Sequence, residues 1–282
     1  MRGCGAARTR PGSGRACGLS LCFALFALIS AGSPAAPAPV GDRDRPNILL
    51  VVLDDVGFND LGFLGSEIKT PNLDALAAAG VTFTEFHATP NCSPTRAMLL
   101  TGVDSHVAGL GNMYEDLAPN QKGKPGYEGY LNQRVAALPE VLQQAGYRTY
   151  MTGKWHLGLD ASNSPAARGF QRSFALLQGG AGAFDNMLAL VGPGKALYRE
   201  DGELLESLPR GFYSTAFYTE RMIEYLEADA DSGKPFFAYL AYTAPHWPLQ
   251  APRESIARYA GAYDEGYDKL RASRLERARA LG

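Results

Sequence analysis

Residues 47–53 of the chain read NILLVVL, a continuous apolar run that ends in two adjacent acids, Asp54 and Asp55. A run of this length without polar alternation is typical of a strand buried on both faces of a parallel sheet. Adjacent carboxylates at the end of such a strand repel each other unless a cation neutralises them. The stretch therefore predicts a parallel sheet and, at its carboxyl edge, a site for a hard divalent metal, with an acidic surface turn as the alternative.

The residues that follow alternate between helical and strand patterns. Residues 70–80 read TPNLDALAAAG, which predicts a short helix that begins at the N-cap Thr70 and ends at Gly80. Further helices are expected over 138–145, 212–226 and 256–281, further strands over 81–86, 147–152 and 235–242, and loops over 120–130 and 179–211. Strands that alternate with helices predict a doubly wound α/β sheet.

The overall composition excludes several classes of protein. The 282 residues are 46% apolar and 20% charged, which is globular composition. The first 40 residues hold four arginines and no acid, so the remainder carries 23 basic and 29 acidic residues, a formal charge of −6. A nucleic-acid binder would carry the opposite balance, and we therefore expect no nucleic-acid partner.

Residues 1–40 predict an export signal. The basic start leads into the apolar stretch 19–29 (LSLCFALFALI), which small residues and prolines follow as far as Ala38. Eleven apolar residues are too few to cross about 30 Å of hydrocarbon, which argues against the alternative of a membrane anchor. We expect cleavage at about residues 31–40 and a mature chain, 41–282, that is free of the membrane and is periplasmic or secreted.

The cysteines single out one position. Cys4, Cys17 and Cys22 lie inside the predicted signal, so the mature chain keeps only Cys92. A lone thiol in an oxidising compartment is a liability unless it is buried, paired between chains or chemically converted. A small buried hydrophobic residue is the common alternative for a single cysteine.

The residues around Cys92 indicate that its side chain has a chemical role. The segment 91–102 reads NCSPTRAMLLTG, in which Pro94 fits the first turn of a helix and places Cys92 at or near its N-terminus. A helix N-terminus lowers the pKa of a thiol, and Arg96, about one turn further on, can reach back toward Cys92. These two features alone predict that Cys92 is a reactive nucleophile. A thiol protease would also need a paired histidine with an Asn or Asp, and no local signature for that arrangement is present.

Two further strands end in residues suited to an anion site. The strand 147–152 is followed by Gly153 and then by Lys154, Trp155 and His156, and the strand 235–242 is followed closely by His246. Each histidine alone is more often structural. Because carboxyl ends of parallel strands meet at one edge of the sheet, we expect carboxylates, a lysine and two histidines to gather there around an anionic substrate.

Together these residues resemble the type I sulfatases. Cys92, Pro94 and Arg96 match the C-x-P-x-R signature in which an enzyme converts the cysteine to formylglycine. The likeness extends to residues 46–55, 70–74, 153–158 (GKWHLG) and the pair Pro245-His246; it covers about 46–282 and is greatest to bacterial arylsulfatases. It implies an alkaline-phosphatase-like α/β fold with a mixed, mainly parallel sheet flanked by helices, of which residues 41–282 are the N-terminal part of the catalytic domain.

The resemblance also implies an activity, namely hydrolysis of small-molecule sulfate esters of the arylsulfatase type. The expected cofactors are Ca²⁺ and 3-oxoalanine (formylglycine), and the expected protein partner is the formylglycine-generating enzyme. By motif position, Cys92 becomes the hydrated nucleophile, Asp54, Asp55 and residue 92 bind the metal, Arg96 supports the hydrate, Lys154 and His246 bind sulfate oxygens or assist the leaving group, and His156 is the general base.

The chain departs from the family pattern at its end. In the family, an Asp-Asn pair that completes the calcium site and another lysine lie beyond the point that corresponds to residue 282. Ca²⁺ takes about six to eight oxygens, and Asp54, Asp55 and the hydrate supply only part of them. We therefore expect a fragment or truncated product, incomplete at its C-terminus, that binds calcium weakly and turns over poorly. The alternatives are a phosphonate or phosphate diester hydrolase of the same superfamily and a non-catalytic fragment that acts at most by binding.

Overall fold

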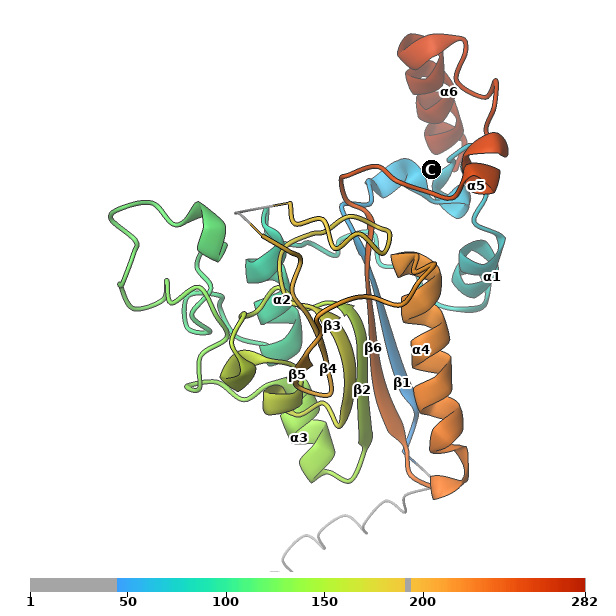
Figure 1. Cartoon of the computed structure of the whole chain (residues 1–282). Coiled ribbons are helices and arrows are strands. Elements are labelled where there is room, and N and C mark those ends of the chain that lie inside the picture. The colour runs from blue at the N-terminus through green and yellow to red at the C-terminus, as the bar shows by residue number, and fades with distance from the viewer. Residues whose placement is uncertain (1–44, 191–193, 282) are drawn as a thin grey trace, which may run out of the picture. The chain divides into compact units, whose positions relative to one another are not determined.

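A computed structural model describes residues 45–190 and 194–281, all within one compact unit of the chain. The expected export signal over residues 1–40, with Cys4, Cys17 and Cys22, lies outside the described residues. Six strands form one sheet in the order β1-β6-β2-β3-β4-β5 (Figure 1). The strands are β1 (Ile48–Asp54), β2 (Arg148–Lys154), β3 (Arg172–Leu176), β4 (Tyr198–Glu200), β5 (Glu203–Leu204) and β6 (Phe236–Pro245). The first four in spatial order run parallel and the last two pairings are antiparallel, which confirms a mixed, mainly parallel sheet.

Helices cover both faces of this sheet. They are α1 (Pro71–Ala79), α2 (Cys92–Thr101), α3 (Leu138–Gln144), α4 (Ser214–Ala228), α5 (Arg253–Ala257) and α6 (Gly266–Leu281), with short 3₁₀ turns at Phe58–Asp60, Gly62–Leu64, Tyr114–Asp116, Ala161–Asn163, Ala166–Arg168 and Ala230–Ser232. α2 and α3 contribute to the core on one face, whereas α4 packs on β6, β2 and β3 on the other. No helix in the described ranges combines the length and the apolar character that a membrane crossing needs.

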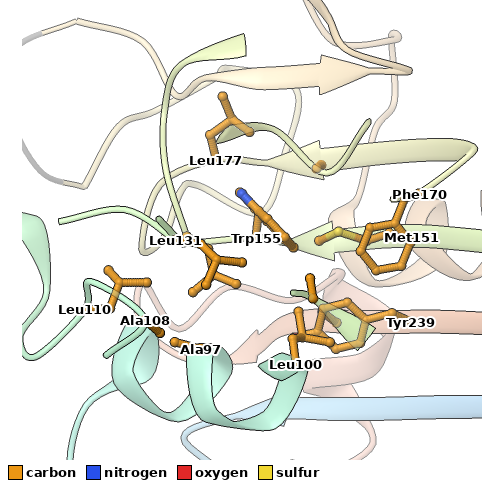
Figure 2. Packing of buried hydrophobic residues seen from close by; sticks show 14 of the residues in the cluster. Ala97, Leu100, Ala108, Leu110, Leu131, Met151, Trp155, Phe170, Leu177 and Tyr239 are labelled. Atoms are coloured by element: carbon orange, nitrogen blue, oxygen red, sulfur yellow. The ribbon is translucent and has the colours of Figure 1, made fainter. Parts of the chain in front are cut away.

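The core between α2 and the sheet fixes the helix that carries Cys92. Figure 2 shows Ala97 and Leu100 of α2 facing Trp155 and Tyr239 from the strand side, and all four are buried. Large side chains that lose all contact with water each contribute about 1.5–3 kcal/mol by transfer from solvent. α2 is therefore held against the sheet by apolar packing, which fixes the helix that begins at Cys92.

β1 is buried on one face only, so the expectation of a strand buried on both faces is wrong. Ile48, Leu50 and Val52 pack against the core cluster that includes α2 and α3. Leu49 and Val51 point to the other face and are 55% and 42% exposed. Their exposure follows from the placement of α4, which packs on β6, β2 and β3 rather than over β1.

Secondary-structure predictions are confirmed where the sequence contains residues that mark both ends of an element. α1 begins after Thr70 and ends before Gly80 as expected, although the Thr70 hydroxyl donates to the Asp74 carboxylate and accepts from the Gly62 N–H instead of capping an N–H of the helix. The predicted strand over 81–86 is wrong, because no described strand pairs with it and Val81 and Phe83 lie in solvent. Alternation of apolar residues marks a strand only when a neighbour supplies the hydrogen-bonded ladder.

Two other regions also differ from expectation. The residues 172–176 form a buried parallel strand that was not predicted, and the expected loop 179–211 contains the two short strands β4 and β5. The single helix expected over 256–281 is divided between α5 and α6, with turns over 258–265.

An arginine side chain anchors the last helix, α6. Arg274 donates hydrogen bonds to Asp60 from Nη1 at 2.6 Å and to Glu67 from Nη2 at 2.6 Å and from Nε at 2.7 Å. These hydrogen bonds lower the pKa of Glu67 to about 2. α6 is therefore tied to the segment that follows β1 by a charge pair of bidentate geometry.

Candidate active site

The expected site residues do gather at one edge of the sheet. Asp54 ends β1, Lys154 ends β2, and His246 directly follows the last residue of β6. Cys92 is the first residue of α2, as Pro94 predicted. Parallel neighbouring strands bring their carboxyl ends together, and in the sheet Asp54 lies opposite Pro245 of β6.

The centre of the site is a buried group of one carboxylate and two cations, which we call the charge cluster (Asp54, Arg96 and Lys154). Lys154 Nζ lies 2.5 Å from Asp54 Oδ2, and Arg96 Nη2 lies 3.3 Å from Asp54 Oδ1. All three residues are at most 5% exposed. Burial raises the pKa of Asp54, but the charges of Arg96 and Lys154 outweigh it and hold that pKa below its usual value. Two basic side chains thus face one ionised carboxylate, and the formal net charge of +1 suits an anion.

Arg96 is oriented by contacts that the sequence did not indicate. Its Nη1 donates to the Lys154 carbonyl oxygen at 2.8 Å and to the Tyr239 hydroxyl at 3.1 Å. Its Nη2 is buried and has no hydrogen-bond acceptor among the described residues, because the contact with Asp54 lacks hydrogen-bond geometry. A buried N–H group without an acceptor is costly, and an oxyanion in the site would satisfy it.

Cys92 is half-buried beside this cluster. One ligand atom from each of Asp54, Cys92 and His246 lies within 4.8 Å of the others. Burial raises the pKa of the Cys92 thiol, and the charge of Lys154, together with a hydrogen bond from the same side chain, offsets this only in part. The expectation that the helix N-terminus would lower that pKa is therefore wrong, since loss of solvent dominates, and the thiol is not a ready nucleophile at neutral pH.

The metal ligands expected from the sequence are only partly brought together. Asp54, Asp55 and Cys92 line a common pocket of about 250 Å³. Asp55, however, has a side chain that is 57% exposed, and its Oδ2 lies 3.7 Å from His246 Nε2. The two carboxylates are donors of the kind that Ca²⁺ prefers, whereas sulfur and imidazole nitrogen are not. The described residues thus fit a calcium ion in the type of their carboxylate donors and supply part of its coordination.

His156 is held by a partner that sequence reasoning missed. Its Nε2 lies 3.0 Å from Oε1 of Glu115, which belongs to the 3₁₀ turn Tyr114–Asp116. His156 is 2% exposed and its backbone has φ 57°, an uncommon value for a residue other than glycine. Glu115 lies 41 positions before His156 in a loop without periodicity, so no local pattern could have paired them.

His246 borders a second pocket, which we call the apolar pocket. Its Nδ1 lies 2.6 Å from the Trp247 carbonyl oxygen, so Nδ1–H donates there and Nε2 faces the site. The apolar pocket measures about 350 Å³ and includes Tyr213, His246, Trp247 and Leu249 in its wall. Among the described residues that line it, none is Asp, Glu, Lys or Arg.

Comparisons with known proteins agree with this geometry. A family model described as Sulfatase matches residues 46–282. The chain is 49% identical to an uncharacterized sulfatase of Schizosaccharomyces pombe over 86% of this chain and 45% of that protein, and 39% identical to the arylsulfatase of Klebsiella aerogenes over 93% and 55%. A crystal structure of Ps i-CgsB in complex with k-i-k-neocarrahexaose superimposes with a TM-score of 0.67 at 29% identity, over 84% of this chain and 53% of that one. The chain spans about half the length of the curated relatives it matches.

Proposed function

The chain belongs to the sulfatase family, and from that premise we propose that it serves the hydrolysis of sulfate esters with residue 92 as the nucleophile. The reaction consumes one water and yields an alcohol and sulfate. The observation that carries the proposal is the charge cluster, whose net charge of +1 is buried beside Cys92. A sulfate ester is an anion with several oxygen acceptors, and the unsatisfied Nη2 of Arg96 is a donor of the right kind for one of them.

We propose that Cys92 acts after conversion to 3-oxoalanine by a formylglycine-generating enzyme. A hydrated aldehyde supplies an oxygen nucleophile at neutral pH, which the thiol, with its pKa raised by burial, does not. Asp54 and Asp55, with the oxygen that conversion places on residue 92, would hold Ca²⁺, which polarises sulfate oxygens when bound. Lys154 adds positive charge next to both Asp54 and residue 92.

The apolar pocket favours an aryl leaving group. Trp247 and Leu249 are largely exposed at its wall, and the described wall residues carry no acidic or basic side chain other than His246. A polysulfated saccharide would need cationic side chains along such a surface, whereas an uncharged aromatic ring needs apolar area and aromatic contact. His246 lies at the edge of this pocket with Nε2 3.7 Å from Asp55 Oδ2, and in this proposal it would serve the oxygen of the departing alcohol.

The test combines a mass with two rates. In the tryptic peptide that contains residue 92, conversion removes about 18 mass units, the difference between SH plus H and O. Protein with this mass shift, supplied with Ca²⁺, is expected to release sulfate from 4-nitrophenyl sulfate faster than it cleaves the matched aryl phosphonate ester. Full sulfate release by protein that keeps a free thiol would refute the role of conversion. A preference for the phosphonate ester would favour the diester hydrolase alternative.

The aryl preference has its own test. Trp247→Ala is expected to raise the KM for 4-nitrophenyl sulfate by about 2- to 10-fold with kcat little changed, because an aromatic contact contributes about 0.5–1.5 kcal/mol. Leu204→Ala, another exposed apolar residue, on β5, is the matched control and should leave KM unchanged. An equal KM for the Trp247 variant and the parent would contradict the assignment of this pocket.

We propose that residues 1–40 are removed as the chain leaves the cytoplasm, so that residues 41–282 act in the periplasm or outside the cell. N-terminal sequencing of protein recovered from those compartments tests it, and an intact Met1 there would contradict it.

A further inference from the structure

His156 has two ring nitrogens in different situations. Nε2 faces the Glu115 carboxylate at 3.0 Å, whereas Nδ1 is buried and has no hydrogen-bond partner among the described residues. The ring is 2% exposed, so water does not replace the missing partner freely. An unpartnered polar atom at that depth is costly in a structural histidine, and it is what a base awaiting a proton requires.

The protonation states follow from the surroundings of the pair. Burial lowers the pKa of His156; the hydrogen bond to Glu115 raises it in part, and the charges of Lys154 and Arg96 lower it again. Burial raises the pKa of Glu115, but the hydrogen bond from His156, with the charge of Lys154, outweighs it and leaves that pKa below its usual value. At neutral pH the ring is therefore neutral and the carboxylate is ionised. An ionised carboxylate only accepts hydrogen bonds, so the hydrogen of the ring sits on Nε2.

A glycine leaves room for this pair. A Cβ atom at Gly179 would lie 2.7 Å from His156 Cε1 and 2.8 Å from Glu115 Oε1. Gly179 does not have the left-handed backbone that would by itself call for glycine. The close approach of the pair is thus the feature at this position that excludes a side chain.

We propose that Glu115 is a positioning residue, which holds His156 with its hydrogen on Nε2 and so makes Nδ1 the nitrogen that takes up the proton during turnover. The catalytic part rests on the proposed function. With residue 92 converted, Nδ1 would accept the proton that a hydroxyl there loses as its electron pair forms the carbonyl and the carbon–oxygen bond to sulfate breaks; the ring would then be a cation with hydrogen on both nitrogens, and the Glu115 carboxylate would offset its charge. The proton then passes to water, and the ring returns to its Nε2–H form.

The test reads the ring directly, in the full chain labelled with ¹⁵N-histidine. The sequence has four histidines, and His156→Gln identifies the signal of interest. Since a free neutral imidazole already favours the Nε2–H form, the decisive signals are a slowly exchanging Nε2–H proton and ¹⁵N shifts at the unmixed limit. Glu115→Leu should lose both, whereas Glu115→Gln, which keeps an acceptor oxygen, should keep the Nε2–H form and lower the pKa of His156.

Activity gives the second readout. In converted protein, Glu115→Leu is expected to lower kcat on the order of 10- to 100-fold with KM little changed, as for carboxylates behind functional histidines elsewhere, and Glu115→Gln should recover part of the loss. Gly179→Ala should act like Glu115→Leu without altering either member of the pair. Glu85→Gln, at an exposed Glu-His contact, is the matched control and should change nothing.

The outcomes separate the two proposals. Hydrogen on Nδ1 in the parent protein, or a Glu115→Leu variant with unchanged ring signals and kcat, would overturn the positioning role. The expected ring signals in converted protein that cleaves no sulfate ester would support the positioning role and overturn the proposed function instead.

Discussion

Asp54→Asn is expected to destabilise the folded protein strongly. It removes the anion from the charge cluster and leaves Arg96 and Lys154 buried together without a counter-charge. Breaking a buried ion pair costs about 3–5 kcal/mol, and two cations at 2.5 and 3.3 Å from one carboxylate put Asp54 at the upper end of that range. For a domain of this size, about 5 kcal/mol corresponds to a fall in Tm of roughly 10–20 °C.

Urea unfolding in the presence of a chelator measures this loss without any contribution from bound calcium. Asp231→Asn, at an exposed aspartate, is the matched control and should stay within about 0.5 kcal/mol of the parent. Adding Lys154→Met to Asp54→Asn removes one of the stranded charges, so the double variant should recover about 1–3 kcal/mol. A loss below about 1 kcal/mol, or a double variant less stable than Asp54→Asn, would refute the account of the cluster.

Three further outcomes follow from other contacts. On the proposed role of His156 as base, its lowered pKa means that kcat of converted protein should rise with pH with a midpoint below the usual value of about 6.5; a rise centred above that pH would contradict it. The depressed pKa of Glu67, about 2, means that its contact with Arg274 stabilises α6 fully above about pH 4.5 and fades as the pH falls toward 2. Glu67→Gln should therefore lower the hydrogen-exchange protection factors of α6 at pH 7, and equal protection factors in the variant and the parent would contradict this anchoring of α6. Gly153→Ala should lower the free energy of unfolding by about 2–5 kcal/mol, since its Cβ would meet a β6 carbonyl oxygen at 1.8 Å with φ at 107°, while Gly211→Ala, in open space, should cost about 1 kcal/mol.

The parts of the site that could be predicted from the sequence are those with a local signal. Asp54 and Lys154 each end a strand whose apolar residues mark it, and Pro94 marks the turn of helix that begins at Cys92. The strand topology then accounts for their proximity, because parallel strands bring their carboxyl ends to one edge of the sheet. Three parallel strands with polar residues at their ends, β1, β2 and β6, thus suffice to place most of the site.

The parts that escaped prediction depend on distant contacts. Glu115 and Tyr239 act through partners 41 and 143 positions away in the sequence, and neither belongs to a pattern that indicates the contact. The pKa of Cys92 was misjudged for a related reason, since a helix terminus is visible in sequence but the depth of burial is not. The strand expected over 81–86 failed because its alternation says nothing about a pairing partner.

The charge cluster has a consequence for how the molecule reaches its working form. Asp54 and Lys154 are 100 positions apart in the chain, so their pairing closes a long loop and depends on non-local contacts. No isolated hairpin or single helix can assemble any fraction of this arrangement. In the proposed enzyme, activity would therefore appear only when these distant segments have come together. Partly folded molecules would show secondary structure but no activity.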